Sequence, residues 1–202
     1  MTIHEFGSRV ATIWEGLRPV TKKMLVGVLQ SSHTAPPAAK IPKFFYDAHA
    51  DWEVSRLLSA LDEQSKQADA AKLDEITQLA DTCVRVLESQ SASAEVFIQL
   101  ATRAVRDNDF DRLERLADQL AERYSAGEIA EIVRQTELPQ IRAIAYETLA
   151  MLPIPMLLPL LDDPLYADIA AAALEQKAYE FDSDEARDIL EQFDAANEFR
   201  GA

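Results

Sequence analysis

Apolar residues recur every three or four positions along most of the chain, which is the spacing of one face of an α-helix. The clearest stripe contains seven residues: Leu73, Ile76, Leu79, Ala80, Cys83, Val84 and Leu87. Such stripes predict helices over residues 8–17, 19–29, 48–64, 69–89, 93–106, 109–124, 126–135, 138–151, 154–162, 164–179 and 183–196. Because the connections are short, consecutive helices are expected to be antiparallel neighbours, in stacked hairpins or alternatively in a helical bundle.

The pattern is interrupted at residues 31–43, where three prolines and small polar residues predict an extended linker. Residues 1–46 contain six Lys/Arg and two Glu, a net charge of +4, whereas residues 47–202 contain fourteen basic and thirty-three acidic residues, a net charge of −19. We therefore predict a basic N-terminal helical arm with a Pro-rich linker over 1–46 and an acidic all-helical domain over 47–202. This division implies that the acidic domain folds without the arm.

Two of the predicted helices repeat the same pattern at a distance of 25 positions. The matched pairs are Pro139 and Pro164, Ile144 and Ile169, Ala145 and Ala170, Thr148 and Ala173, and Leu149 and Leu174. A shift of 28 positions brings the same frame to Leu116, Ala117 and Leu120. An internal repeat of irregular period favours stacked hairpins over a bundle.

The stretches LPQIRAIAYETLAMLP and DDPLYADIAAAALEQ, separated by IPMLLPLL, resemble the helix pairs of HEAT or armadillo-type repeats over about residues 109–180. Five residues match the family's pattern of an early proline, an apolar-Arg pair and close-packing positions: Pro139, Ile141, Arg142, Ala145 and Leu149. The second copy departs from it, with Ala167 and Asp168 in place of the apolar-Arg pair. The resemblance implies an α-α superhelix that holds protein partners on its surface.

Composition agrees with an all-α class, because helix formers dominate and only five glycines occur in 202 residues. Cys83 is the single cysteine, so an internal disulfide is excluded and a reducing compartment, the cytoplasm, is expected. Its place on an apolar stripe predicts a buried thiol rather than a reactive one. No signal peptide is expected, because the first residues include acids and lack an uninterrupted apolar run followed by a cleavage site. No membrane-spanning segment is expected, because the longest apolar stretch is short and rich in proline.

One segment has residue types that bind metal ions, YDAHADWE, with Asp47, His49, Asp51 and Glu53. On a helix the pair Asp47 and Asp51 would point about 160° away from the pair His49 and Glu53, since successive residues turn by about 100°. Four ligands cannot converge in this way, and acids at a helix start are favoured by the helix dipole. We assign no metal ligand, no catalytic residue and no cofactor.

The sequence therefore predicts a non-enzymatic protein-protein interaction or scaffold module that uses an acidic helical-repeat surface. The expected partner is a protein, with a basic one favoured by the charge, and the arm is a candidate for self-association; nucleic acid and stable membrane insertion are not expected. Two alternatives remain, an acidic inhibitor or immunity-type protein that masks a basic partner, and an enzyme of unknown class. The candidate partner-contact residues are Trp14, Lys22, Lys23, Asp47, His49, Asp51 and Trp52.

Overall fold

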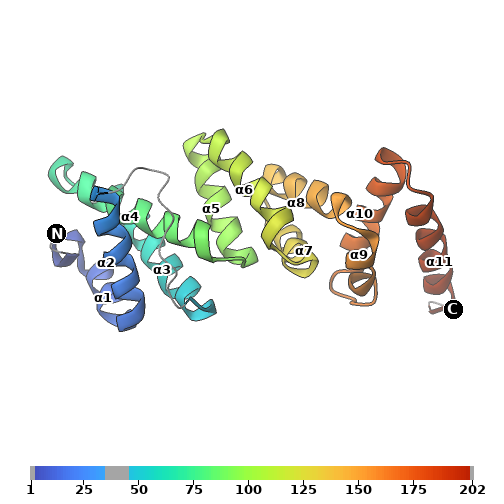
Figure 1. The fold of residues 1–202 in the computed structure, drawn as a ribbon, viewed down its shortest axis with the longest axis horizontal. Coiled ribbons are helices and arrows are strands. Elements are labelled where there is room, and N and C mark those ends of the chain that lie inside the picture. Colours follow the sequence, from blue (N-terminus) through green and yellow to red (C-terminus); the bar gives the residue numbers. More distant parts are fainter. Residues whose placement is uncertain (1–2, 35–45, 201–202) are drawn as a thin grey trace. The chain divides into compact units, whose positions relative to one another are not determined.

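The computed structural model describes residues 3–34 and 46–200, and in these residues it has no strand. Eleven α-helices of the described chain pack against their neighbours, so the predicted all-α class is confirmed (Figure 1). The chain forms two compact units, an N-terminal unit (Met1–Ser91) and a C-terminal unit (Ala92–Ala202). The predicted division between residues 46 and 47 lies inside the N-terminal unit.

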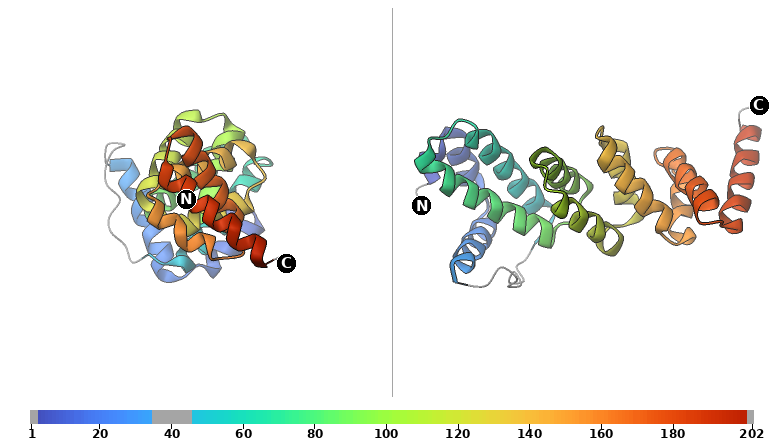
Figure 2. Two further views of the ribbon diagram at one scale, coloured as in Figure 1. Left: turned by 90° about the vertical axis from the view of Figure 1, so that its right-hand side faces the viewer. Right: turned by 90° about the horizontal axis from the view of Figure 1, so that it is seen from above.

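The N-terminal unit combines the predicted arm with the first two helices of the predicted acidic domain. It contains the short 3-10 helix η1 (Ile3–Phe6) and the helices α1 (Ser8–Gly16), α2 (Pro19–Thr34), α3 (Ala48–Ser65) and α4 (Ala70–Gln90). Helix α1 packs on α3, α2 packs on α4, and α3 lies along α4 (Figure 2). The buried face of the arm consists of Phe6, Val10, Leu17, Met24, Leu25 and Val28. These side chains share one core with α3 and α4.

Helix α1 begins at the predicted residue, Ser8, with Gly7 as its N-cap, whereas α2 extends beyond its predicted end. Gly7 has φ 106°, a backbone conformation that residues with a Cβ rarely adopt, so glycine is favoured there. Helix α2 continues to Thr34 instead of ending near residue 29, because the first helix-breaking residue after Pro19 is Pro36. The rest of the predicted linker lies outside the described residues.

The C-terminal unit contains seven helices, whose bounds differ from the predicted ones by a few residues. They are α5 (Ala94–Asp107), α6 (Phe110–Arg123), α7 (Ala126–Gln135), α8 (Pro139–Met151), α9 (Ile154–Leu161), α10 (Ala167–Glu180) and α11 (Asp184–Arg200). Most helices pack on the one that follows or the next but one: α5 on α6 and α7, α6 on α8, α7 on α8 and α9, α8 on α10, and α10 on α9 and α11. Helix α5 also contacts α8, and α7 also contacts α10. The core therefore runs along the unit between two rows of helices.

Several connections are held by polar side chains that satisfy helix ends. The hydroxyl of Ser125 accepts a hydrogen bond from the backbone N–H of Glu128 at the start of α7. The Glu128 carboxylate in turn accepts one from the backbone N–H of Ala94, at the start of α5, at 2.6 Å. At the other end of a helix, the Lys177 ammonium of α10 donates to the last-turn carbonyl of Ala150 in α8 at 2.7 Å. Neighbouring helices thus cap one another.

The two copies of the 25-residue pattern occupy α8 and α10, which pack against each other. Ala145, Thr148 and Leu149 are buried, as are their counterparts in α10, and the two isoleucines of the pattern are both half-buried. The prolines are not equivalent, because Pro139 is the first residue of α8 whereas Pro164 lies three positions before α10 begins. The four apolar positions of the pattern therefore have matching environments in the two helices.

Candidate functional site

The predicted contact residues all lie in the N-terminal unit, where Arg18 joins the turn between α1 and α2 to the start of α3. Its guanidinium donates two hydrogen bonds to the Asp47 carboxylate, at 2.7 and 2.9 Å. Its Nε and its backbone N–H donate to the two oxygens of Glu53, at 3.0 and 2.6 Å. The Thr21 hydroxyl also donates to Glu53, which is only 2% exposed. A buried carboxylate is thereby fully paired, as burial of a charge requires.

These contacts set the pKa values of the two carboxyl groups. The Arg18 guanidinium, helped by the Ala50 backbone N–H, holds the pKa of Asp47 well below its ordinary value. Burial works in the opposite direction at Glu53, but hydrogen bonds from Thr21 and Arg18 outweigh it, so the pKa of Glu53 is also lowered. The same two carboxylates raise the pKa of Arg18. The cluster therefore favours the charged form of all three groups in the folded unit.

We expect acid to destabilise the N-terminal unit through this cluster. Groups whose folded-state pKa is lowered contribute stability above their unfolded pKa, about 4 for Asp and Glu, and lose it as the pH falls through the folded pKa. Burial raises the pKa of Asp51, so this residue acts in the opposite sense, stabilising below about pH 4. Urea midpoints measured from neutral to acidic pH should fall less in Glu53→Gln than in the wild type. An equal fall of the urea midpoint in both proteins would show that Glu53 does not contribute to the acid sensitivity of this unit.

Of the other candidate residues, His49 lies beside this cluster, with its Nε2 3.8 Å from a carboxylate oxygen of Glu53. Asp51 accepts a hydrogen bond from the Tyr46 hydroxyl at 2.6 Å, whereas Asp47 caps the start of α3 by accepting from Ala50. The His49 ring lies 5.4 Å from the ring of Trp52, whose side chain is exposed.

The candidates on the arm are separate from one another. Trp14 is half-buried and Lys23 is exposed, whereas the Lys22 ammonium donates to the carbonyl of Glu15 at 2.9 Å. The structure thus assigns structural contacts to Asp47, Asp51 and Lys22. The chemistry of Arg18 and Glu53 was missed because their contacts span thirty-five positions in sequence.

A small groove lies between α1 and α3. Thr12, Ile13, Gly16 and Leu17 form one wall, and Trp52, Glu53 and Arg56 form the other. The Arg56 guanidinium lies 4.5 Å from the centre of the Trp52 ring, a cation-π contact. The cavity volume is about 210 Å³, below the range of about 300–1,000 Å³ of small-molecule sites. The groove is therefore too small to identify a ligand.

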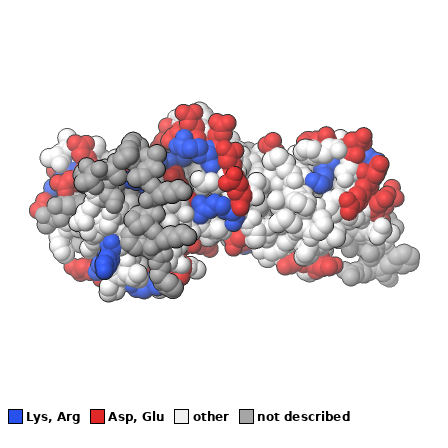
Figure 3. All heavy atoms as spheres, viewed as in Figure 1, with Lys and Arg blue, Asp and Glu red and all other residues white. Residues whose placement is uncertain are grey.

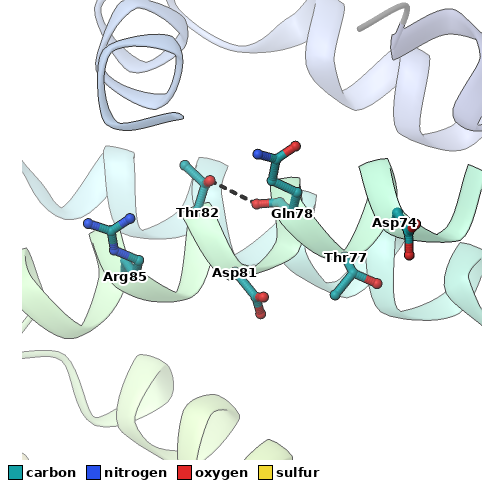
Figure 4. Close-up of a pocket in the computed structure, with 6 residues that line it drawn as sticks. All are labelled: Asp74, Thr77, Gln78, Asp81, Thr82 and Arg85. Carbon is teal, nitrogen blue, oxygen red and sulfur yellow. Dashed lines mark hydrogen bonds between the residues drawn. The ribbon is translucent and has the colours of Figure 1, made fainter. Parts of the chain in front are cut away.

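A larger hollow of about 430 Å³ runs along α4 (Figure 4). Its lining residues all come from successive turns of this one helix: Asp74, Thr77, Gln78, Asp81, Thr82 and Arg85. The Thr82 hydroxyl donates back to the carbonyl of Gln78 at 2.8 Å. Small-molecule sites are mainly apolar and enclosed. Because all of its lining residues belong to one helix, this hollow is an open surface depression rather than such a site.

The C-terminal unit has most of the charge of the protein. Residues 92–202 contain ten Lys/Arg and twenty-three Asp/Glu, a net charge of −13, whereas residues 1–91 contain ten and twelve, a net charge of −2. Most basic side chains of the C-terminal unit bind groups within it. Those with such contacts are Arg103, Arg106, Arg112, Arg134, Arg142, Lys177 and Arg187. The uncompensated charge of this unit is therefore acidic, and Figure 3 shows acidic side chains gathered over α10 and α11.

Helix α9 in the same unit exposes apolar side chains. Its sequence, IPMLLPLL, has no polar residue, and Ile154, Leu157 and Leu160 are buried. Met156 and Leu158 are 42% and 40% exposed on the remaining surface of the helix. Met151 at the end of α8 and Leu165 just after α9 are exposed by 54% and 56%. We call Met151, Met156, Leu158 and Leu165 the α9 patch; the arrangement is suited to contact with another molecule rather than to chemistry.

In the part of the chain that the structure describes, no group of three His, Cys, Asp or Glu is arranged to hold a metal ion. No single described helix is long and apolar enough to cross a membrane, and only α8 and α9 taken together pass this test, with a bend of 114° between them. Cys83 is buried, as its place on the apolar stripe predicts.

No family model, curated protein or solved structure matches this chain.

Proposed function

We propose that the protein is a non-enzymatic interaction module whose acidic C-terminal unit binds a basic protein partner. The observation that carries the proposal is the net charge of −13 on this unit, in which most basic side chains are already paired internally. A surface of one sign attracts a partner of the opposite sign and increases the rate of encounter. It also disfavours nucleic acid, whose phosphates have the same sign.

The proposed unit is a short helical repeat of the HEAT kind. Two observations support this: helices next but one in sequence pack together, and equivalent positions of α8 and α10 have equivalent burial. Repeat units of this type stack into surfaces that are larger than any one helix pair provides. In this proposal the internal capping contacts, such as that of Lys177 with Ala150, hold successive helices in register while the acids face outward.

The proposal is tested by measuring the fluorescence anisotropy of labelled peptides added to the full-length protein. The probe is a short helical peptide with lysine on one face and leucine on the other, and the control replaces each lysine with glutamate. We expect the lysine peptide to bind and the glutamate peptide not to bind. Raising the salt from low to moderate concentration should weaken binding, because the Debye length falls to about 8 Å at physiological ionic strength. Equal affinity for both peptides, or none for either, would contradict the proposal.

A further inference from the structure

We infer that the α9 patch is the docking site for a basic segment of a partner protein that has large apolar side chains. This inference rests on the proposed function and specifies where the partner binds. The patch consists of four exposed apolar residues, Met151, Met156, Leu158 and Leu165, around an eight-residue helix. Met156 and Leu158 are two positions apart on the helix, so they lie at the two edges of its exposed side, with Pro155 and Pro159 between them. This apolar side offers the centre that the core of a protein-protein interface requires.

The apolar surface of α9 exceeds what folding needs. Ile154, Leu157 and Leu160 recur every three positions and fill the side of α9 that faces α7 and α10. A helix buried on one side ordinarily has polar residues on the other. Here Pro155, Met156, Leu158 and Pro159 are all exposed and all apolar. Nothing within the described part of the unit covers these side chains, so a partner would gain from burying them.

The conformation of the patch is restrained before any partner arrives. Pro155 is in the first turn of α9 and Pro159 is inside the helix, and the proline ring fixes φ at both positions. Less backbone entropy is then lost when a partner binds. Methionine side chains, by contrast, are flexible and adapt to partners of different shape. A helix with a restrained backbone and flexible methionine side chains at its surface is therefore suited to bind one short segment of a partner.

The charges beside the patch specify a basic partner. Asp162 is the C-cap of α9 and Asp163 follows it, and both side chains are exposed. The Asp163 carboxylate accepts a hydrogen bond from the backbone N–H of Leu165 at 2.9 Å, but it has no cationic partner within the described chain. The C-terminal end of a helix is already negative, so the charge of the two carboxylates is unfavourable there without a nearby cation. Among the described residues neither carboxylate pairs with a lysine or arginine, and Arg134 of neighbouring α7 is bound to Glu131. A lysine or arginine next to the apolar anchors of the partner would supply the missing charge.

The test compares matched glutamine variants in the same anisotropy assay with the full-length protein. Met156→Gln and Leu158→Gln remove apolar surface while keeping a good helix former at an exposed position. The control is Phe110→Gln, which changes an exposed apolar residue of α6 that is 65% exposed and lies outside the patch. We expect the double variant at 156 and 158 to bind the lysine peptide about tenfold more weakly, as for a loss of about 1.4 kcal/mol. The control should bind within twofold of the wild type.

Other outcomes distinguish the two proposals. If the lysine peptide binds the wild type, the double variant and the control equally, the docking site is not at α9, but the proposed binding of a basic partner by the acidic unit is still supported. If the peptide does not bind the wild type at any salt, the proposed function fails and the docking site fails with it. Phosphatidylcholine vesicles provide the second probe. Capture of the wild type but not of the double variant by vesicles, without peptide binding, would identify a lipid contact and overturn the inference.

Discussion

Deletion of residues 1–46 is expected to unfold the rest of the N-terminal unit instead of releasing a stable acidic domain. The arm contributes six large apolar side chains to the core that it shares with α3 and α4, among them Phe6, Met24 and Leu25. It also supplies Arg18, the guanidinium partner of the buried carboxylate of Glu53. Without the arm, two helices would remain with one face open to water, and isolated helices are marginally stable.

Hydrogen exchange monitored by mass spectrometry measures this directly. Peptides from α3 and α4 should exchange rapidly in the truncated protein and slowly in the full-length protein. Peptides from α7 and α8 provide the internal control, because both helices belong to the C-terminal unit and should keep their protection. Retention of full protection in α3 and α4 after truncation would restore the division between residues 46 and 47 that the sequence suggested.

The second large effect is expected from Glu53→Gln. The amide has the same shape as the carboxylate but no charge, and its NH₂ group cannot accept hydrogen bonds from the donors of Thr21 and Arg18. Removal of one member of a buried ion pair costs about 3–5 kcal/mol, and the lower end applies because Arg18 keeps Asp47 as a partner. The free energy of unfolding measured with urea should therefore be about 3 kcal/mol lower in the variant than in the wild type.

A matched control for this variant is Glu63→Gln, also on α3. Glu63 pairs with Arg9, but both side chains are more than half exposed. Exposed ion pairs contribute about 0–1 kcal/mol to stability, so the free energy of unfolding of Glu63→Gln should remain within about 0.5 kcal/mol of the wild-type value. Similar losses in the two variants would mean that the buried position of Glu53 has no special role in the stability of the unit.

The helices could be predicted from sequence because their signals are local. Apolar spacing and short polar connections identify elements such as α7, whose predicted and observed bounds agree at residues 126–135. The shared core of the N-terminal unit could not be predicted in the same way. The contact between Arg18 and Glu53 joins residues thirty-five positions apart, and charge counting placed these two residues in different domains. A difference in net charge along a chain does not show which helices pack together.

The candidate surfaces show a second limit of sequence reasoning. Trp52 could be named as a contact candidate from the sequence, but only the structure shows that its side chain is 53% exposed and lies against Arg56. The run IPMLLPLL predicted a helix, but a helix with no polar residue has no periodicity to show which side faces water. Only the packing of α7 and α10 against Ile154, Leu157 and Leu160 reveals that the opposite side is exposed.

Methionine methyl NMR of the full-length protein would show whether the acidic C-terminal unit binds a basic partner at the α9 patch. Of the four methionines, Met151 and Met156 belong to the patch, Met24 is buried in the N-terminal unit and Met1 is the first residue. On addition of the lysine peptide, the signals of Met151 and Met156 should shift together and saturate, while that of Met24 stays in place. Saturable binding that leaves Met151 and Met156 unchanged would contradict the account.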